Sequence, residues 1–211
     1  MQDAIGASGE DVAFFARLKV DLLRSCIDRA PPRILDFGCG IGNITAQLAA
    51  EFRGAQVTGC DVSVRSIANA TARNTNGERV TFLAFGAALP FADSSFDLAF
   101  TSCVFHHIDR AEHEYWAKEL RRVLAPGGAL FVFEHNPYNP LTQRVVRDCV
   151  FDKGVVLLKP GYTRRLLQRA GFSAAPAKFY FFFPRVLAWL RPLERVLGWL
   201  PVGAQYFVIG K

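Results

Sequence analysis

Short apolar runs alternate along the chain with segments in which apolar residues recur every three or four positions. The runs predict strands at residues 33–37, 56–60, 80–85, 96–101, 129–134, 178–183 and 205–209. The three-and-four spacing predicts helices at about 11–29, 44–52, 116–124 and 163–170, with another beginning at Ser63. Strands that alternate with helices form a parallel sheet covered on both faces. The pattern therefore predicts a doubly wound α/β fold.

The 211 residues show no internal repeat and no low-complexity linker, so we expect a single domain over residues 1–211. Residues 136–160 are rich in Pro and Asn and are predicted to be irregular, within a basic and hydrophobic region at about 136–204. The composition, 51% hydrophobic and 21% charged, excludes a disordered chain. No apolar run approaches the roughly eighteen residues of a membrane span.

The five cysteines are odd in number, widely scattered and contain no C-x-x-C pair. This arrangement argues against a disulfide framework and a structural zinc site, and we predict no metal site. The first stretch, MQDAIGASGEDV, carries acidic residues and lacks the basic region of a signal peptide. We therefore expect a cytoplasmic protein.

The formal net charge of +6 is unevenly distributed. Residues 1–139 hold 13 Lys/Arg and 16 Asp/Glu, whereas residues 140–211 hold 12 Lys/Arg and only 3 Asp/Glu. The basic excess is either a solvated face or a surface that meets an anionic substrate or an anionic membrane. A nucleic-acid partner is not expected, because the chain carries no recognition-helix, zinc-finger or RNA-binding signature.

The most informative segment is ILDFGCGIGNIT at residues 34–45, where a strand ends at Asp36 and glycines follow at Gly38, Gly40 and Gly42. Such a turn between a strand and a helix lets a ligand approach the backbone closely. The dinucleotide fingerprint G-x-G-x-x-G needs its third glycine at position 43, which is Asn43. This spacing disfavours a nicotinamide-binding oxidoreductase.

The spacing D-x-G-x-G-x-G resembles motif I of the class I S-adenosylmethionine (SAM)-dependent methyltransferases, and the resemblance covers about residues 35–133. The segments LPFADSSFD at 89–97 and RVLAPGGAL at 122–130 match further motifs of that family. The chain looks most like the methyltransferase type 11 group, which acts on metabolites and lipids. The resemblance implies a Rossmann-like, seven-stranded, mostly parallel sheet with an antiparallel last strand. It also implies SAM as cofactor and methyl transfer (EC 2.1.1.-) by in-line displacement.

We expect eight residues at the cofactor site: Asp36, Gly38, Cys39, Gly40, Gly42, Asp61, Val62 and Phe85. The resemblance implies that Asp36 organises the turn and the methionine amino end, that Asp61 binds the ribose hydroxyls and that Val62 packs on adenine. Many relatives carry an Asp before the LPF segment that contacts the adenine amino group, and this chain has no acid there. Phe85 is therefore either an adenine contact or a core aromatic residue at a strand end.

Three of the four histidines follow the predicted fourth and fifth strands: His106, His107 and His135. Ligands in open α/β sheets bind beyond the carboxyl ends of the strands, so these positions border the acceptor. An oxygen or nitrogen acceptor can need a general base, and each of the three is a candidate. The alternatives are packing, orientation of a neighbour, or binding of the acceptor.

Residues 186–200 place apolar side chains on one stripe that Pro192 is expected to break into two short helices. Tryptophan and arginine together on such a segment are typical of an interfacial anchor. Packing on the sheet, a lid over the acceptor pocket, membrane contact and dimerisation remain open. We expect a small-molecule or lipid-like, anionic acceptor and peripheral contact with the inner face of a membrane. The rival hypothesis is a catalytically silent SAM-binding protein with a regulatory or scaffolding role.

Overall fold

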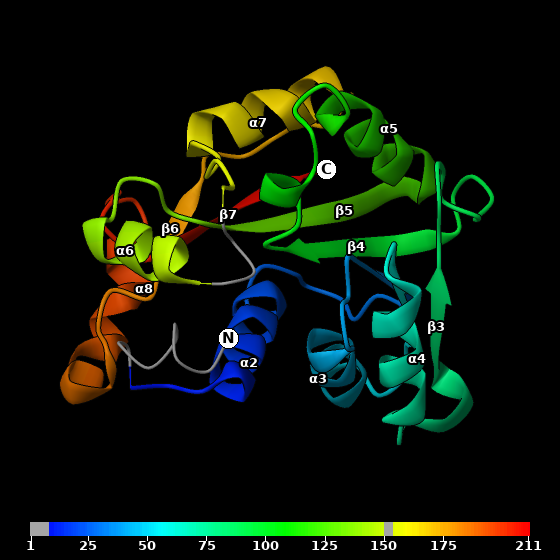
Figure 1. The fold of residues 1–211 in the computed structure, drawn as a ribbon, viewed down its shortest axis with the longest axis horizontal. Coiled ribbons are helices and arrows are strands. Elements are labelled where there is room, and N and C mark those ends of the chain that lie inside the picture. The colour runs from blue at the N-terminus through cyan, green and yellow to red at the C-terminus, as the bar shows by residue number, and fades with distance from the viewer. Residues whose placement is uncertain (1–8, 150–153) are drawn as a thin grey trace.

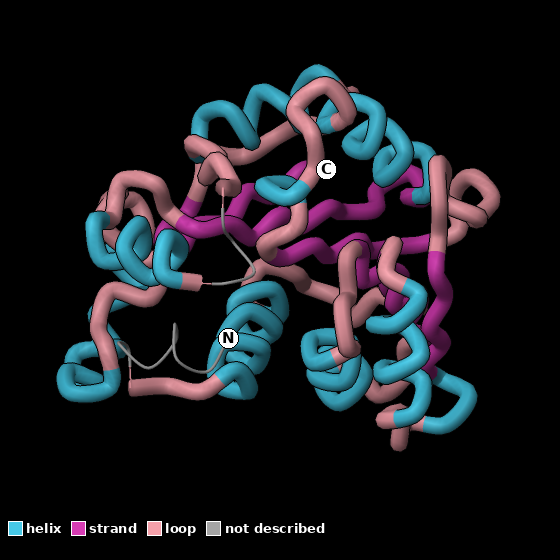
Figure 2. Tube along the Cα trace, viewed as in Figure 1, coloured by secondary structure: helices cyan, strands magenta, loops and turns pink. Residues whose placement is uncertain are grey.

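The computed structural model describes residues 9–149 and 154–211, which form a seven-stranded sheet with helices on both faces (Figures 1 and 2). The strands are β1 Arg33–Phe37, β2 Gln56–Asp61, β3 Val80–Ala84, β4 Phe96–Ser102, β5 Leu124–His135, β6 Lys178–Tyr180 and β7 Gln205–Gly210. Their order across the sheet is β3-β2-β1-β4-β5-β7-β6. Strands β1 to β5 are parallel, and β7 is antiparallel to both β5 and β6. The doubly wound, mostly parallel α/β fold is thus confirmed.

Helices cover the two faces of the sheet in separate layers (Figure 1). One layer holds α2 Val12–Arg24, α3 Asn43–Glu51 and α4 Val64–Ala72, and the other holds α5 His113–Val123 and α7 Pro160–Arg169. Leu35 and Phe37 of β1 belong to the apolar core beneath α5 and α7, whereas Ile34 belongs to the core beneath α2 and α3. Because side chains alternate along a strand, Asp36 points into the α2–α3 layer.

The predicted strand at 178–183 is shorter in the structure, because β6 ends at Tyr180. Phe181 adopts a left-handed backbone with φ of 57°, which a continuing strand does not allow. The backbone N–H groups of Phe181, Phe182 and Phe183 then donate to the carboxylate of Glu194, at 2.9, 3.1 and 3.2 Å. A side chain therefore takes the place of a partner strand.

The sequence predicts an irregular stretch at 136–160, and this prediction is wrong for α6 Pro140–Asp148. The side chain of Asn139 accepts a hydrogen bond from the Thr142 N–H, and Pro140 occupies the first turn. Asn before Pro is a helix start signal as well as a loop signal. Residues 150–153 of the stretch lie outside the described residues.

The segment after β6 contains a 3₁₀ run, Arg185–Leu193, with Pro192 inside it, followed by α8 Glu194–Leu197. Neither element has a buried residue. Val186 and Trp189 of the predicted apolar stripe are 84% and 74% exposed, whereas Leu190, Leu197 and Leu200 are half-buried, so the stripe packs only in part. Trp199, which lies off the stripe, is 74% exposed. Among the described residues, no helix combines the length and apolar character that crossing a membrane requires.

Candidate functional site

The glycine turn at the end of β1 requires left-handed backbone at every second position. Gly38, Gly40 and Gly42 have φ of 74°, 56° and 79°. The N–H groups of Gly38 and Cys39 both donate to the carbonyl of Cys60, at 2.8 and 3.0 Å, which ties the turn to β2. A Cβ on Gly38 would lie 2.3 Å from Val104 Cγ2, so this glycine is needed for packing as well as for backbone conformation.

Gly40 lies at the open side of the turn, where an added Cβ would meet nothing within 4 Å. Its N–H donates to Asp61 Oδ2 at 2.9 Å, and Ser63 N–H donates to Asp61 Oδ1 at 2.8 Å. Asp61 therefore links the glycine turn to the start of α4. Each carboxylate oxygen can accept two hydrogen bonds, so both retain capacity for the hydroxyls of a ribose.

Asp36 is buried and accepts a hydrogen bond of 2.6 Å from the Thr45 hydroxyl of α3. Burial raises the pKa of Asp36 to about 7, although the Thr45 hydrogen bond opposes that shift. The nearby Asp61 carboxylate raises the pKa further, and Lys19 lowers it. A cation bound at the turn would favour the ionised form of this carboxyl.

The other cofactor-site residues differ in what they offer a ligand. Val62 is 65% exposed, so its side chain is available for an apolar contact. The Phe85 ring is buried, with ring centroids 5.4 Å from Phe37 and 5.3 Å from Trp116. Of the two interpretations of Phe85, the structure therefore gives its side chain the core position. The Cys39 N–H is bonded to the Cys60 carbonyl, and burial raises the pKa of the Cys39 thiol.

His106 and His107 lie in a 3₁₀ turn, Phe105–His107, directly after β4. His106 is buried, and its Nδ1 lies 2.6 Å from Glu134 Oε2 of β5. The other oxygen of Glu134 accepts the Phe105 N–H at 3.1 Å. His106 is thus fixed by a buried carboxylate, whereas His107 is exposed.

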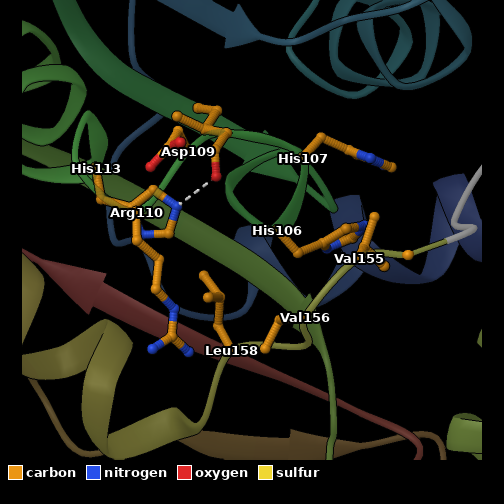
Figure 3. Close-up of a pocket in the computed structure, with 10 residues that line it drawn as sticks. His106, His107, Asp109, Arg110, His113, Val155, Val156 and Leu158 are labelled. Carbon is orange, nitrogen blue, oxygen red and sulfur yellow. Dashed lines mark hydrogen bonds between the residues drawn. The ribbon is translucent and has the colours of Figure 1, made fainter.

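A cleft of about 620 Å³ lies beside this 3₁₀ turn, bordered by His107, Asp109, Arg110 and Val156 (Figure 3). His113 forms its inner wall, where Nε2 bonds the carbonyls of Phe105 and Ile108 at 2.8 and 3.0 Å. His113 Nδ1 bonds the Tyr162 hydroxyl of α7 at 2.9 Å. The fourth histidine therefore holds the turn in place.

His135 ends β5 and takes part in a polar group that the sequence prediction did not include. Its Nδ1 lies 3.4 Å from Gln205 Nε2. Nearby, the buried Lys19 of α2 donates to Ser102 Oγ at 2.7 Å, and its Nζ lies 4.0 Å from Cys103 Sγ. A signal for Lys19 existed, because it shares a helix face with the apolar Ala16, Val20 and Leu23.

The Cys103 thiol has the most perturbed acidity of this group. Burial raises the pKa of Cys103, but the His135 and Lys19 side chains outweigh it and lower the pKa to about 6. Within residues 9–149 and 154–211, no three His, Cys, Asp or Glu side chains are grouped to hold a metal ion.

Comparison with known proteins gives a family match over the part of the chain that holds the glycine turn. Residues 34–128 match a family model described as a methyltransferase domain. The chain is 39% identical over 123 residues to a demethylmenaquinone methyltransferase of Thermus thermophilus, covering 57% of this chain and 54% of that protein. It is 29% identical over 216 residues to the 2-methyl-6-phytyl-1,4-hydroquinone methyltransferase of Synechocystis, covering 92% of this chain and 67% of that protein. The chain thus spans about half to two thirds of these relatives.

Solved structures extend the likeness to the fold. A SAM-dependent methyltransferase from Mesorhizobium loti has a TM-score of 0.66 and 24% sequence identity, covering 91% of this chain and 96% of that one. That likeness covers more of the chain than the matched residues 34–128. The family match includes the glycine turn and Asp61, and the described chain has the fold of solved SAM-dependent methyltransferases.

Proposed function

We propose that this chain binds SAM at the glycine turn and transfers its methyl group to a lipid-like acceptor with a quinol-type head. The observation that carries the proposal is the turn itself, with three left-handed glycines, open space over Gly40 and the Asp61 carboxylate fixed beside it. These features fit a ligand that has an amino-acid end and a ribose. SAM supplies a methyl group already activated by a sulfonium, so the protein mainly has to align the acceptor.

We assign the cofactor contacts as follows. Asp36 faces the amino group, Gly38, Cys39, Gly40 and Gly42 provide backbone, and Asp61 accepts from the ribose hydroxyls. Val62 covers one side of adenine. Phe85 contributes its backbone while its ring stays in the core, because the ring already packs against Phe37 and Trp116.

The acceptor class rests on the relatives and on the outer surface of this chain. Both curated relatives described above are named for quinone or hydroquinone acceptors. The residues around the 3₁₀ run form an exposed apolar surface, which we call the tryptophan patch: Val186, Trp189, Leu193, Val196, Trp199 and Val202. Arg185 and Arg195 lie within the same segment. We propose that the tryptophan patch rests on an anionic bilayer, where such acceptors are dissolved.

The cofactor proposal is tested by isothermal titration of the protein with SAM. We expect micromolar binding that is lost in Asp61→Ala and weakened in Asp61→Asn, which keeps the shape of the side chain. Asp28→Ala, a change at an exposed aspartate, is the matched control and should bind as wild type. Wild-type protein that does not bind SAM would refute the proposal.

Catalysis and silent binding are separated by product analysis. The bound, labelled SAM is mixed with a membrane extract, and S-adenosylhomocysteine and labelled lipid are measured together. We expect both products to appear in equal amounts. Binding of SAM without either product would favour the regulatory or scaffolding alternative.

The membrane proposal is tested by flotation with vesicles that contain about one third anionic lipid. We expect wild type to float and the Trp189→Ser/Trp199→Ser double variant to stay at the bottom. Val64→Ser, which removes an apolar residue that is 71% exposed on α4, is the control and should float. Wild-type protein that remains unbound would contradict the membrane proposal and leave the cofactor proposal standing.

A further inference from the structure

The carboxyl ends of β4 and β5 hold five polar side chains that we call the strand-end cluster: Lys19, Ser102, Cys103, His135 and Gln205. They come from α2, the end of β4, the end of β5 and the start of β7. β4 is the strand next to β1, where Phe37 pairs with Thr101. The cluster therefore lies at the switch point of the sheet, beside the glycine turn, where ligands of open α/β sheets bind.

Lys19 is the least expected member, because its side chain is only 6% exposed. Within the described part of the chain, no carboxylate lies within ion-pair distance of its ammonium, whose hydrogen bonds go to Ser102 and Cys103. A buried charge is tolerated only when an opposite charge or strong hydrogen bonds compensate it. The Cys103 sulfur is the group in contact with Lys19 that can become an anion.

His135 is oriented so that it also supports a sulfur anion. The Tyr180 hydroxyl donates to Gln205 Oε1, which turns the amide nitrogen of Gln205 toward His135 Nδ1. An Nδ1 that accepts this hydrogen bond leaves the ring proton on Nε2. The other side of the ring is then a hydrogen-bond donor, and a hydrogen bond from His135 lowers the pKa of Cys103.

Cys103 is one of three cluster members that are partly exposed, together with Ser102 and His135, whereas Lys19 and Gln205 are buried. The left-handed φ of 57° at Cys103 turns the chain sharply away from β4. The titratable groups that act on the sulfur are Lys19 from α2, Glu134 and His135 from β5, Tyr180 from β6 and Tyr206 from β7. Of these, His135 and Lys19 favour the thiolate and Glu134 disfavours it.

We propose that the strand-end cluster ionises the acceptor, with the Cys103 sulfur as general base and the Lys19 ammonium as the partner of the resulting oxyanion. This inference rests on the proposed function, since it concerns the acceptor of the same methyl transfer. The acceptor O–H bond breaks, its proton forms an S–H bond with Cys103, and its electron pair stays on the acceptor oxygen. The acceptor then attacks the methyl group of SAM, and the C–S bond electrons return to sulfur to give a thioether.

The charges of the cluster select the class of acceptor. Before proton transfer, the Cys103 thiolate neutralises the positive charge of Lys19. After proton transfer, the acceptor oxyanion neutralises that charge instead. The balance holds for a neutral acceptor with an acidic hydroxyl, such as a phenol, a quinol or an enol. A carboxylate would add a second anion beside the thiolate, and a protonated amine would add a second cation beside Lys19, so both are disfavoured.

The ionisation of Cys103 is measured without any acceptor, by the pH dependence of iodoacetamide alkylation resolved for each cysteine by peptide mass spectrometry. We expect the midpoint for Cys103 near pH 6 in wild type, against about 8.5 for an ordinary thiol. Lys19→Met keeps an unbranched side chain, one atom shorter, and removes the charge. This variant should raise the alkylation midpoint of Cys103 by at least one pH unit. A wild-type midpoint at the ordinary value would overturn the proposal, whatever the result with SAM.

The role in transfer is measured anaerobically with 1,4-naphthohydroquinone and, as the blocked probe, 1,4-dimethoxynaphthalene. We expect methylation of the hydroquinone only, with kcat lowered about 10²–10⁴-fold in Cys103→Ser and the acid limb of the pH profile near 6 lost. The Kd for SAM should stay unchanged in that variant, and Cys26→Ser is the matched control. Full activity of Cys103→Ser, equal methylation of both probes, or no methylation by a wild type that binds SAM would each overturn the proposal. Failure to bind SAM would refute the proposed function instead.

Discussion

Replacing Asp36 by asparagine separates what this carboxylate does for stability from what it does for the cofactor. The pKa of Asp36 in the folded protein is raised from 3.8 to about 7, chiefly by burial. A raised carboxyl pKa means that folding is opposed increasingly as pH climbs from about 4 to about 7. At about 1.4 kcal/mol per pKa unit, the raised pKa of Asp36 costs the folded state about 4 kcal/mol at pH 8, where the carboxyl is ionised, and about 2 kcal/mol at pH 5, where the folded protein keeps it protonated.

The amide introduced by Asp36→Asn would keep an oxygen for the Thr45 hydroxyl and would carry no charge, so this variant should stabilise the cofactor-free protein. Urea unfolding at pH 8 and pH 5 measures this gain. It should be about 2 kcal/mol larger at pH 8, because the cost of burying the amide does not depend on pH and cancels in the comparison. SAM should bind roughly 10- to 100-fold more weakly to the variant, which lacks the charged partner of the amino group.

Asp28→Asn makes the same chemical change at an exposed position and should alter neither quantity. A stability gain that is equal at both pH values would show that the pKa of Asp36 is not raised by burial as described. Unchanged SAM affinity would remove Asp36 from the cofactor site. Either result refutes the corresponding half of the reasoning.

Four further substitutions test separate parts of the structure. Gly38→Ala places a Cβ 2.3 Å from Val104 and should lower the free energy of unfolding, measured by urea titration, by about 3 kcal/mol. Gly40→Ala has the same left-handed backbone but open space around the new Cβ, so it should lower that free energy by only about 1 kcal/mol. Asn136→Ala should cost about 3 kcal/mol in the same assay, because the buried amide donates to the carbonyls of Pro201 and Gly203 at 3.0 and 2.7 Å. Glu134→Gln removes the anion that raises the pKa of Cys103 and should move the alkylation midpoint of that thiol below the wild-type value.

The strands and the glycine turn could be predicted because their signals are local. The ranges 33–37 and 56–60 agree with β1 and β2 to within one residue, whereas β5 begins five residues before the predicted 129–134, because it continues through Pro126, Gly127 and Gly128. The turn is recognisable because left-handed backbone at three alternate positions leaves glycine as the only unstrained choice. Its positions Gly38, Gly40 and Gly42 all adopt that conformation.

Element ends that depend on distant side chains were not predictable in this way. The aromatic run at 178–183 is apolar after its first residue, and nothing in its own composition marks Tyr180 as the end of β6. The end is set by Glu194, whose carboxylate takes the N–H groups of the next three residues. At Asn139 and Pro140 the sequence predicted a loop where the structure has a helix. Asn and Pro are common in loops, but they also begin helices, and here they begin α6.

The two halves of the candidate site differ in the same respect. Most of the residues proposed to bind the cofactor lie between Asp36 and Val62, inside the family match at residues 34–128. The acceptor half needs Lys19 from before that match and His135 and Gln205 from after it, brought together only by the sheet order that places β7 beside β5. The family match therefore includes the proposed cofactor residues, whereas of the strand-end cluster it includes only Ser102 and Cys103. His135 of the neighbouring strand and Lys19, 84 positions away, both lower the pKa of Cys103, and only the folded chain brings these groups together.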